Sequence, residues 1–429
     1  MPAYTMKRFL FVCLCISGLF VFCLGASAHV AGDADGDGLV LAADARLVLR
    51  ASVELETFTG ESFCALDTDG DDVLTAKDAR SVLRASVELE TLPETQKNTA
   101  LTARKDPVVS LNGAYYTYND LCRDLETLQT LAPSRFSYTS LGQTADGREI
   151  WCAVLGTGKA KNRILADVAI HGSEHRNTPA VMRIIEEYLR NYDRAFYKGK
   201  TVREILDDTD LYILPMLNPD GAAISQTGLE GLNKQSSKDR VQAIYRSNRS
   251  AGRTGMSFAR YLNEWKANVN GVDLNRNLQF SDKRFLYETN VPAPAARDYA
   301  GDRANPEAET AAYRKLAESL PDLAASLSIH TQGELIYWDC RQPEKGRAAA
   351  KRLANTVSAA SGYRLDMSDS FVGAVADWMM IEKGIPAVTV ECGKGRNPIA
   401  ADETPKIYEA LKTVFLAVVL ENTNTPYAG

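Results

Sequence analysis

Residues 164–175, which read ILADVAIHGSEH, decide the fold of the larger part of this chain. The first seven residues, Ile164 to Ile170, form an apolar run of the length and composition of a buried strand. The polar group HGSEH, residues 171–175, follows at once at the strand exit. Functional side chains are therefore expected at the ends of strands in this domain.

Between residues 108 and 425, strand-like apolar runs alternate with helical stretches. The predicted strands are Ile164–Ile170, Leu211–Leu214, Leu323–Ile329 and Ala387–Val390. The predicted helices are Thr178–Tyr192, Glu307–Leu320, Ala348–Ala360 and Pro405–Leu420. Strands separated by helices in this way predict an α/β domain whose sheet is buried between helix layers.

The pair His171 and Glu174 can bind one zinc ion, because a His and a carboxylate three residues apart at a strand exit can share a metal. A third protein ligand would leave the fourth position open for water, as in catalytic sites. The chain has only four histidines, and His29 lies at the start of the mature chain predicted below. The remaining candidates for the third ligand are His175 and His330, and His330 ends another apolar strand. His175 is expected to face substrate, solvent or the residues around the ligands.

Two further segments are WKANVNGVDLNRN, residues 265–277, and IPAVTVECG, residues 385–393. Together with HGSEH, LPMLNPDG (residues 214–221) and SIHTQGELIYW (residues 328–338), they resemble the zinc carboxypeptidase family, typified by carboxypeptidase A. The motifs occur in the order of the family and cover most of residues 108–425. The resemblance implies an α/β sandwich around a mixed sheet.

The resemblance also implies the catalytic residues. One zinc ion would be held by His171, Glu174 and His330, and Glu391 would be the general base that takes the proton of the attacking water. Since the chain has no spare imidazole to act as base, a carboxylate is expected to transfer this proton.

Three more residues are implied to bind the substrate. Asn275 and Arg276 would hold its terminal carboxylate, for which a planar guanidinium is suited. Lys266 stands where some branches of the family carry an arginine, and this cation would stabilise the tetrahedral oxyanion.

The motifs WKANxxGVDLN, HTQGELIYW and VECGKGRNP resemble those of the bacterial subgroup that cleaves the γ-D-glutamyl-diaminopimelate bond of peptidoglycan stem peptides. The mobile Tyr of digestive carboxypeptidases has no counterpart in Ser368-Asp369-Ser370, and Ala376 is neither a bulky apolar nor an acidic selector. We therefore expect a secreted zinc peptidase acting on peptide or isopeptide bonds of stem peptides. A carboxypeptidase for ordinary peptides is one alternative, and a non-catalytic module that only holds cell-wall peptides is another.

A tandem repeat precedes this domain, with DADGDGLVLAADARLVLRASVELET at residues 33–57 and DTDGDDVLTAKDARSVLRASVELET at residues 67–91. Each copy places acids at loop positions one, three, five and twelve, the spacing that surrounds a calcium ion with oxygen ligands. The predicted ligands of two calcium ions are Asp33, Asp35, Asp37 and Asp44 in the first loop and Asp67, Asp69, Asp71 and Asp78 in the second.

A short helix is predicted after each loop, with three apolar residues on one face that bury against the other helix. These are Ala45, Val48 and Leu49 in the first repeat and Ala79, Val82 and Leu83 in the second. Residues 29–92 resemble a dockerin, a small all-α calcium-binding module that attaches extracellular enzymes to a cohesin-bearing scaffold. Ala42-Ala43 and Ala76-Lys77 occupy the recognition positions. A calcium-dependent stabiliser without a partner is the alternative.

The first 28 residues are predicted to be a signal peptide. Lys7 and Arg8 precede an apolar run from Phe9 to Leu24, and the small residues Ala26-Ser27-Ala28 follow. The run is short for a membrane span, so we expect a mature protein without one. The protein is expected outside the cell or at its surface, in a cellulosome-like complex.

The composition agrees with an ordinary soluble protein, with 45% apolar and 24% charged residues. A formal net charge of −6 and the lack of a clustered basic face argue against a nucleic-acid partner. The five cysteines after residue 28 are scattered without a CxxC pair, which supports neither a disulfide framework nor a thiolate zinc site. Polar residues 93–107 are predicted to link the two domains.

Overall fold

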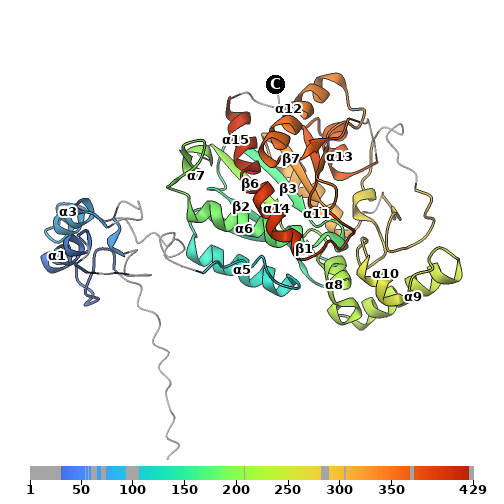
Figure 1. Ribbon diagram of the computed structural model, residues 1–429, viewed down its shortest axis with the longest axis horizontal. Coiled ribbons are helices and arrows are strands. Elements are labelled where there is room, and N and C mark those ends of the chain that lie inside the picture. Colours follow the sequence, from blue (N-terminus) through green and yellow to red (C-terminus); the bar gives the residue numbers. More distant parts are fainter. Residues whose placement is uncertain are drawn as a thin grey trace, which may run out of the picture.

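The computed structural model contains a small helical unit near the N-terminus and a larger α/β body (Figure 1). The structure describes residues 30–53, 55–56, 58, 65–68, 74–92, 106–206, 208–281, 289–303, 306–367 and 372–424. The predicted signal peptide, most of the predicted linker, and Asp69 and Asp71 lie outside the described residues.

The body is built on one eight-stranded sheet in the order β1-β2-β6-β3-β7-β10-β8-β9. The strands are β1 (Phe136–Gln143), β2 (Glu149–Leu155), β3 (Asn162–Val168), β6 (Thr209–Leu214), β7 (Leu323–His330), β8 (Leu335–Tyr337), β9 (Arg364–Leu365) and β10 (Ala387–Glu391). The four adjacent strands β6, β3, β7 and β10 are parallel to one another. The pairs β1–β2, β2–β6 and β10–β8 are antiparallel. The predicted mixed sheet is confirmed.

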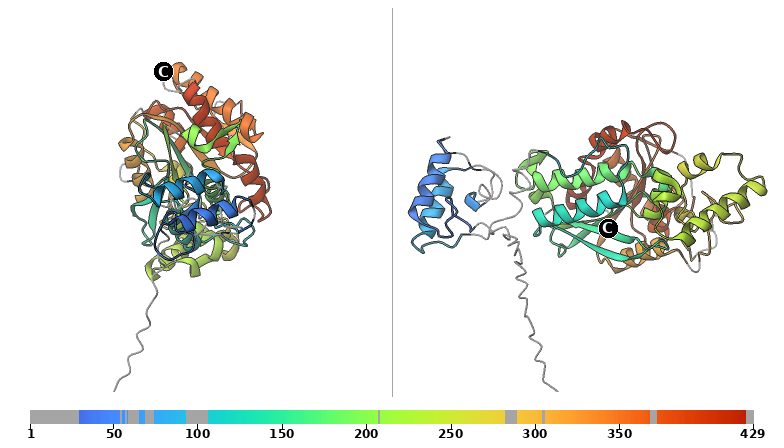
Figure 2. Two further views of the ribbon diagram at one scale, coloured as in Figure 1. Left: turned by 90° about the vertical axis from the view of Figure 1, so that its left-hand side faces the viewer. Right: turned by 90° about the horizontal axis from the view of Figure 1, so that it is seen from below.

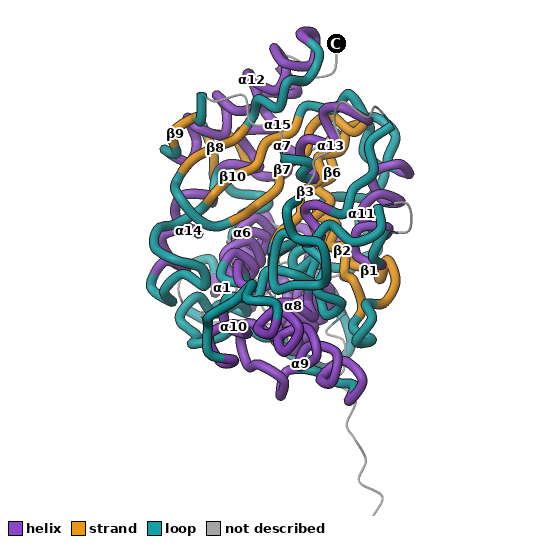
Figure 3. The backbone as a smooth tube through the Cα atoms, turned by 90° about the vertical axis from the view of Figure 1, so that its right-hand side faces the viewer, coloured by secondary structure: helices purple, strands orange, loops and turns teal. Residues whose placement is uncertain are grey.

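Helices cover both faces of this sheet, and Figure 3 shows α6, α12 and α14 on one side and α11 and α13 on the other. The helices of the body are α5 (Tyr118–Leu131), α6 (Asn177–Arg190), α7 (Val202–Leu206), α8 (Pro219–Thr227), α9 (Gln235–Ser250), α10 (Phe258–Asn263), α11 (Ala308–Ser319), α12 (Glu344–Ser361), α13 (Val375–Glu382), α14 (Glu403–Leu411) and α15 (Val414–Asn424). A small hairpin of β4 (Ala195–Tyr197) and β5 (Lys200–Thr201) precedes α7. None of the described helices combines the length and the apolar composition that a membrane span requires.

The predicted elements are found with shifted ends, and one prediction is wrong. Pro405–Leu420 is not one helix but two, α14 and α15, with a turn at residues 412–413 between them. An apolar pattern continues across such a turn when both helices face the same core, so hydrophobicity alone could not reveal the break. The four cysteines that the structure describes are free: Cys122, Cys152, Cys340 and Cys392.

Three parallel strands in the middle of the sheet, β3, β7 and β10, lie side by side. Their registers pair Val168 with Ile329 and His330 with Glu391. Since parallel strands end at the same edge, the residues after β3 and the last residues of β7 and β10 meet there. The candidate ligands and Glu391 therefore lie at strand ends, as expected from the sequence.

Asn218, in the motif LPMLNPDG after β6, ties this edge together. Its Nδ2 donates to the backbone oxygens of Ile170, Lys266 and Ala267 at 3.0, 3.2 and 3.1 Å, and its Oδ1 accepts from the Gly221 amide at 2.9 Å. The side chain is fully buried. One amide thus joins three segments that are far apart in sequence.

Close packing around Gly172 explains why a glycine follows the first histidine of HGSEH. A Cβ at Gly172 would lie 2.3 Å from the carbonyl carbon of Gly221, which is closer than any real contact. The Gly172 amide donates to the Lys266 oxygen at 2.9 Å. Only glycine therefore allows the chain to pass between α8 and the backbone at Lys266.

The N-terminal unit consists of α1 (Ala42–Ala51) packed against α3 (Ala76–Ala85), and the left view of Figure 2 shows both helices along their length. Its core contains Ala45, Val48, Leu66, Leu74, Ala79 and Val82. Leu49 and Leu83, predicted to be buried, are instead 48% and 47% exposed. Asp44 and Asp78 take the buried positions beside this core, so the buried stripe is rotated toward the loops and both leucines face outward.

We predict that Asn218→Ala lowers the free energy of unfolding by at least about 2 kcal/mol, because it removes donors from buried carbonyl oxygens. Urea unfolding followed by circular dichroism measures this change. Asn112→Ala, at an exposed asparagine, should stay within about 0.5 kcal/mol of wild type. Equal stabilities of the two variants would contradict the role of Asn218.

Candidate active site

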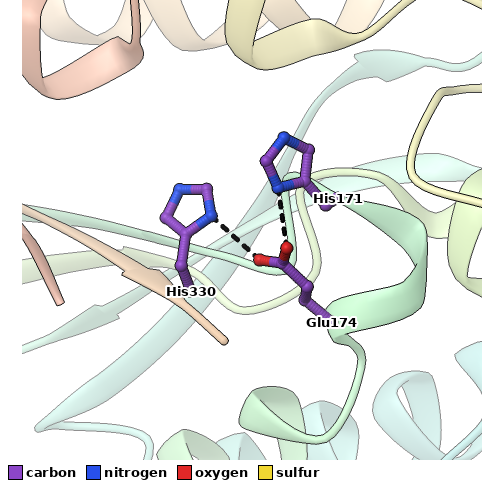
Figure 4. Close-up of side chains that lie close together, drawn as sticks. All are labelled: His171, Glu174 and His330. Atoms are coloured by element: carbon purple, nitrogen blue, oxygen red, sulfur yellow. Dashed lines mark hydrogen bonds and ion pairs between the residues drawn. The ribbon is translucent and has the colours of Figure 1, made fainter. Parts of the chain in front are cut away.

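The structure brings His171, Glu174 and His330 together at the carboxyl edge of the sheet (Figure 4). His171 follows β3, Glu174 ends the short 3-10 turn Gly172–Glu174, and His330 ends β7. The two Nδ1 atoms lie 2.9 Å from the two carboxylate oxygens of Glu174. All three side chains are buried, and one ligand atom from each lies within 4.8 Å of the others. Two imidazole nitrogens and one carboxylate oxygen are a donor set suited to zinc, with a fourth position left open.

Electrostatics keep Glu174 in the ionised form that a metal ligand needs. Burial raises its pKa, but the charges of His171, Lys266 and His330 lower it by more, so the pKa lies well below the usual value. For His330, burial lowers the pKa, but the carboxylates of Glu174, Glu391 and Asp167 together raise it above the usual value. The buried carboxylate and its neighbours therefore stabilise each other's charges.

Asp273 supports the first histidine. Its Oδ1 lies 3.2 Å from His171 Nε2, the ring nitrogen that does not contact Glu174. Backbone amides of Asn275 and Asp298 donate to the same carboxylate at 3.1 and 3.0 Å. Burial raises the pKa of Asp273, but the hydrogen bond to His171 and the charges of His171, Arg276 and Lys266 together lower it to well below the usual range. A fixed carboxylate behind a ligating imidazole orients the ring and increases its basicity.

His330 is supported in the same way by two residues. Its Nε2 lies 3.1 Å from Ser328 Oγ, which donates to Asp167 Oδ2 at 2.8 Å. Asp167 is completely buried, and burial raises its pKa to about 6.

Sequence reasoning missed both supporting acids. Asp273 lies within the DLNRN motif, and Asp167 is the one charged residue of the apolar run from Ile164 to Ile170. A charge in a strand that is otherwise apolar was the available signal for Asp167.

Lys266 and Glu391 lie beside the ligands. Lys266 Nζ is 3.1 Å from Glu174 Oε1. Burial lowers the pKa of Lys266, but Glu174 and Asp273 raise it by more, so it remains a cation. Glu391 ends β10 directly opposite His330, and burial and the neighbouring Glu174 raise its pKa, against the lowering effect of His330.

A cavity of about 340 Å³ opens at this point. Its lining includes Lys266, Arg297, Glu391, Arg396 and Asn397. Asn397, a further residue that sequence reasoning missed, donates through Nδ2 to Glu174 at 3.2 Å and to the Thr331 oxygen at 2.8 Å. The cavity is therefore strongly polar and is joined directly to the candidate metal ligands.

Asn275 and Arg276 lie at the flank of the site, directly after Asp273. Asn275 is buried and its Oδ1 accepts from the Val375 amide at 2.8 Å, while Arg276 Nη1 donates to the Asn275 backbone oxygen at 2.8 Å. Neither residue lines the 340 Å³ cavity. Their contact with a substrate carboxylate stays a prediction.

His175 does not join the group of ligands. It is 1% exposed, its ring centre lies 6.4 Å from that of Tyr115, and its Nδ1 has no partner among the described residues. Burial lowers its pKa to about 3, with a smaller effect of Arg176. A solvent-facing position for His175 is therefore excluded.

Three carboxylates of the first acidic loop of the N-terminal unit lie close together. Carboxylate oxygens of Asp33, Asp35 and Asp44 lie within 4.8 Å of one another, whereas Asp37 caps the Leu39 amide at 2.8 Å. In the second loop, Asp67 and Asp78 are buried, and Asp78 accepts from the Thr68 and Thr75 amides.

Comparison with known proteins identifies the family. Residues 121–409 match the family model described as zinc carboxypeptidase, so the chain belongs to the zinc carboxypeptidase family and is a metallopeptidase. Gamma-D-glutamyl-L-diamino acid endopeptidase 1 of Lysinibacillus sphaericus is 29% identical over 304 residues, which are 70% of this chain and 72% of that protein. The uncharacterized protein YqgT of Bacillus subtilis is 31% identical over 283 residues, 64% of this chain and 69% of that one.

Solved structures show the same fold. The structure of bovine thrombin-activatable fibrinolysis inhibitor in complex with tick carboxypeptidase inhibitor aligns with a TM-score of 0.55 at 16% identity, over 73% of this chain and 99% of that one. The carboxypeptidase A of Helicoverpa armigera aligns with a TM-score of 0.53 at 18% identity, over 76% of this chain and 78% of that one.

We predict that Asp273→Asn weakens zinc binding about 10- to 100-fold, because the amide removes the negative charge behind His171. Competition with a chromogenic chelator measures the affinity. Asp298→Asn, which changes an exposed neighbouring acid, should bind zinc like wild type. Wild-type affinity in Asp273→Asn would show that Asp273 does not support the metal site.

Proposed function

We propose that this protein is a zinc peptidase that hydrolyses the γ-D-glutamyl-diamino acid bonds of peptidoglycan stem peptides. The observation that carries the proposal is the buried group of His171, Glu174 and His330 with Lys266 and Glu391 beside it. The substrate class is supported by the similarity of 70% of the chain to a gamma-D-glutamyl-L-diamino acid endopeptidase.

The residues would divide the chemistry as follows. Zinc, when held by His171, Glu174 and His330, supplies a Lewis acid for the scissile carbonyl and lowers the pKa of a water ligand. Glu391 takes a proton from the attacking water on its carboxylate and returns it to the leaving amine. Lys266 donates to the carbonyl oxygen as negative charge develops on it.

Asn275 and Arg276 would hold a free carboxylate on the leaving part of the substrate. The same pair also favours the second candidate, a carboxypeptidase for ordinary peptides, because any C-terminal residue carries such a carboxylate. Carboxypeptidase A2 of Rattus norvegicus is 23% identical over 257 residues, 57% of this chain and 54% of that protein. Substrate panels therefore have to separate the two candidates.

We further propose that residues 1–28 direct export and that residues 29–92 bind two calcium ions and attach the enzyme to a cohesin-bearing scaffold. Support comes from the 34-residue repeat and from the clustered carboxylates of the first loop. The repeat also duplicates exposed apolar side chains, a feature typical of interaction surfaces. These are Leu49, Val53 and Leu55 in the first copy and Leu83, Val87 and Leu89 in the second.

Digestion of defined peptides tests the enzymatic proposal. Zinc-loaded wild type should release diaminopimelate-containing products from γ-D-glutamyl stem peptides and leave α-linked peptides of equal length largely intact, as measured by mass spectrometry. Glu391→Gln should bind one zinc per chain yet lose at least about 100-fold in kcat, because the amide cannot accept the proton. Chelation should abolish turnover and zinc should restore it.

The exposed Glu409→Gln serves as the matched control and should keep wild-type turnover. Wild-type turnover in Glu391→Gln would exclude Glu391 as the base. Zinc-dependent cleavage of α-linked peptides alone would favour the second candidate, and zinc binding without hydrolysis of any peptide would favour a binding module.

Calcium titration into the full chain tests the N-terminal unit. Calorimetry should detect two sites in wild type and one in Asp44→Ala, because position twelve closes the loop around the ion. Asp402→Ala, at an exposed acid of the body, should keep both sites. Calcium binding without capture by any member of a cohesin panel would favour the intramolecular stabiliser, and the absence of calcium binding would exclude both roles.

A further inference from the structure

Three cations from separate segments line the cavity next to the candidate catalytic residues: Lys266, Arg297 and Arg396. Lys266 contacts the candidate metal ligand Glu174, and Arg396 Nη2 pairs with Glu264 at 3.0 Å. Arg297 and Arg396 are both exposed, but the partner of Arg396, Glu264, is only 15% exposed. The one ion pair of Arg297 among the described residues is a 3.3 Å contact with its neighbour Asp298, which is itself 48% exposed. Such exposed pairs contribute little, so Arg297 remains available to an anionic ligand.

The backbone around Arg297 is anchored to the candidate metal site on both sides. The Ala296 oxygen accepts from the amides of Lys266 and Ala267, both at 2.9 Å, and the Asp298 amide donates to Asp273 at 3.0 Å. Asp298 has a φ of 63°, in the left-handed region that non-glycine residues rarely adopt. The surrounding structure therefore determines the position from which Arg297 enters the cavity.

Arg297 also lies within electrostatic reach of Lys266. Both side chains line the same cavity. Two like charges held in one cavity repel each other, and an anion bound beside them relieves that repulsion. Two acids also line the cavity, but Glu264 is paired with Arg396 and Glu391 is the candidate base. Arg297 is therefore the cation that favours a ligand with a negative group near the scissile carbonyl.

The chemistry of the γ-glutamyl bond supplies such a group. Asn275 and Arg276, which would hold the leaving part, do not line this cavity, so the cavity is left for the acyl part of the substrate. In a γ-linked glutamyl residue the free α-carboxylate is separated from the scissile carbonyl by Cα and two methylenes. An α-linked peptide carries a carboxylate at this spacing only where the acyl residue is itself a glutamate, whereas every γ-linked glutamyl residue carries one.

We propose that Arg297 binds the free α-carboxylate of the γ-linked glutamyl residue and thereby selects γ-glutamyl substrates over ordinary peptides. This assignment rests on the proposed function. Arg297, which would recognise the acyl part of the substrate, lies outside the motifs that define the family resemblance.

The test uses two stem peptides that differ only in the D-glutamyl residue, with an α-carboxylate in one and an α-carboxamide in the other. Wild type should prefer the carboxylate at least about tenfold in kcat/KM, because a guanidinium can bind a carboxylate through two parallel hydrogen bonds. In Arg297→Gln the ratio of kcat/KM for the carboxylate peptide to that for the carboxamide peptide should fall toward one. The carboxamide peptide should still be cleaved at a rate near that of wild type. Arg297→Lys should restore part of the preference, because it restores the charge but not the planar fork.

Arg396→Gln is the matched control, since Arg396 lines the same cavity but is paired with Glu264, and it should keep the preference whatever its effect on the overall rate. Zinc content is measured for every variant. An unchanged preference in Arg297→Gln, an equal loss on both peptides, or the absence of a preference in wild type would overturn the role of Arg297 alone. Cleavage of α-linked peptides only, by wild type, would overturn the proposed function and this assignment with it.

Discussion

The need to stabilise one buried carboxylate, that of Glu174, organises this site. Its oxygens contact His171, His330, Lys266 and Asn397, which come from four separate segments. An ionised carboxylate without such partners would be very costly to bury. Each of these segments must therefore bring a donor to the same point, and the resulting cluster has the composition of a zinc site.

The sheet and a few buried polar residues hold these donors in place. Parallel strands β3, β7 and β10 end at one edge, and Asn218 joins the end of β3 to the backbone around Lys266. Asp273 and the pair of Ser328 and Asp167 then support the outer nitrogens of the two histidines. Rings with one nitrogen occupied can present only the other to the centre of the cluster, so the ligand geometry is prepared before a metal binds.

Sequence patterns predicted the central strands, the candidate ligands and the alternation of strands and helices, because buried strands and HxxE spacing are local features. The supporting residues Asp273 and Asp167 were not predicted, since their function depends on neighbours that are distant in the chain. The burial of Leu49 and Leu83 was predicted wrongly. A helical stripe shows which residues share a face, but the partner helix decides how that face is rotated.

The sequence by itself determined the α/β class, the family motifs and a small set of candidate residues, because these follow from apolar periodicity, residue type and spacing. Only the tertiary structure decided which polar groups meet: the acid behind each histidine, the separation of Asn275 and Arg276 from the main cavity, and the place of Arg297 beside Lys266. The physical reason is that burial and charge pairing are properties of three-dimensional neighbourhoods, which join residues far apart in the chain.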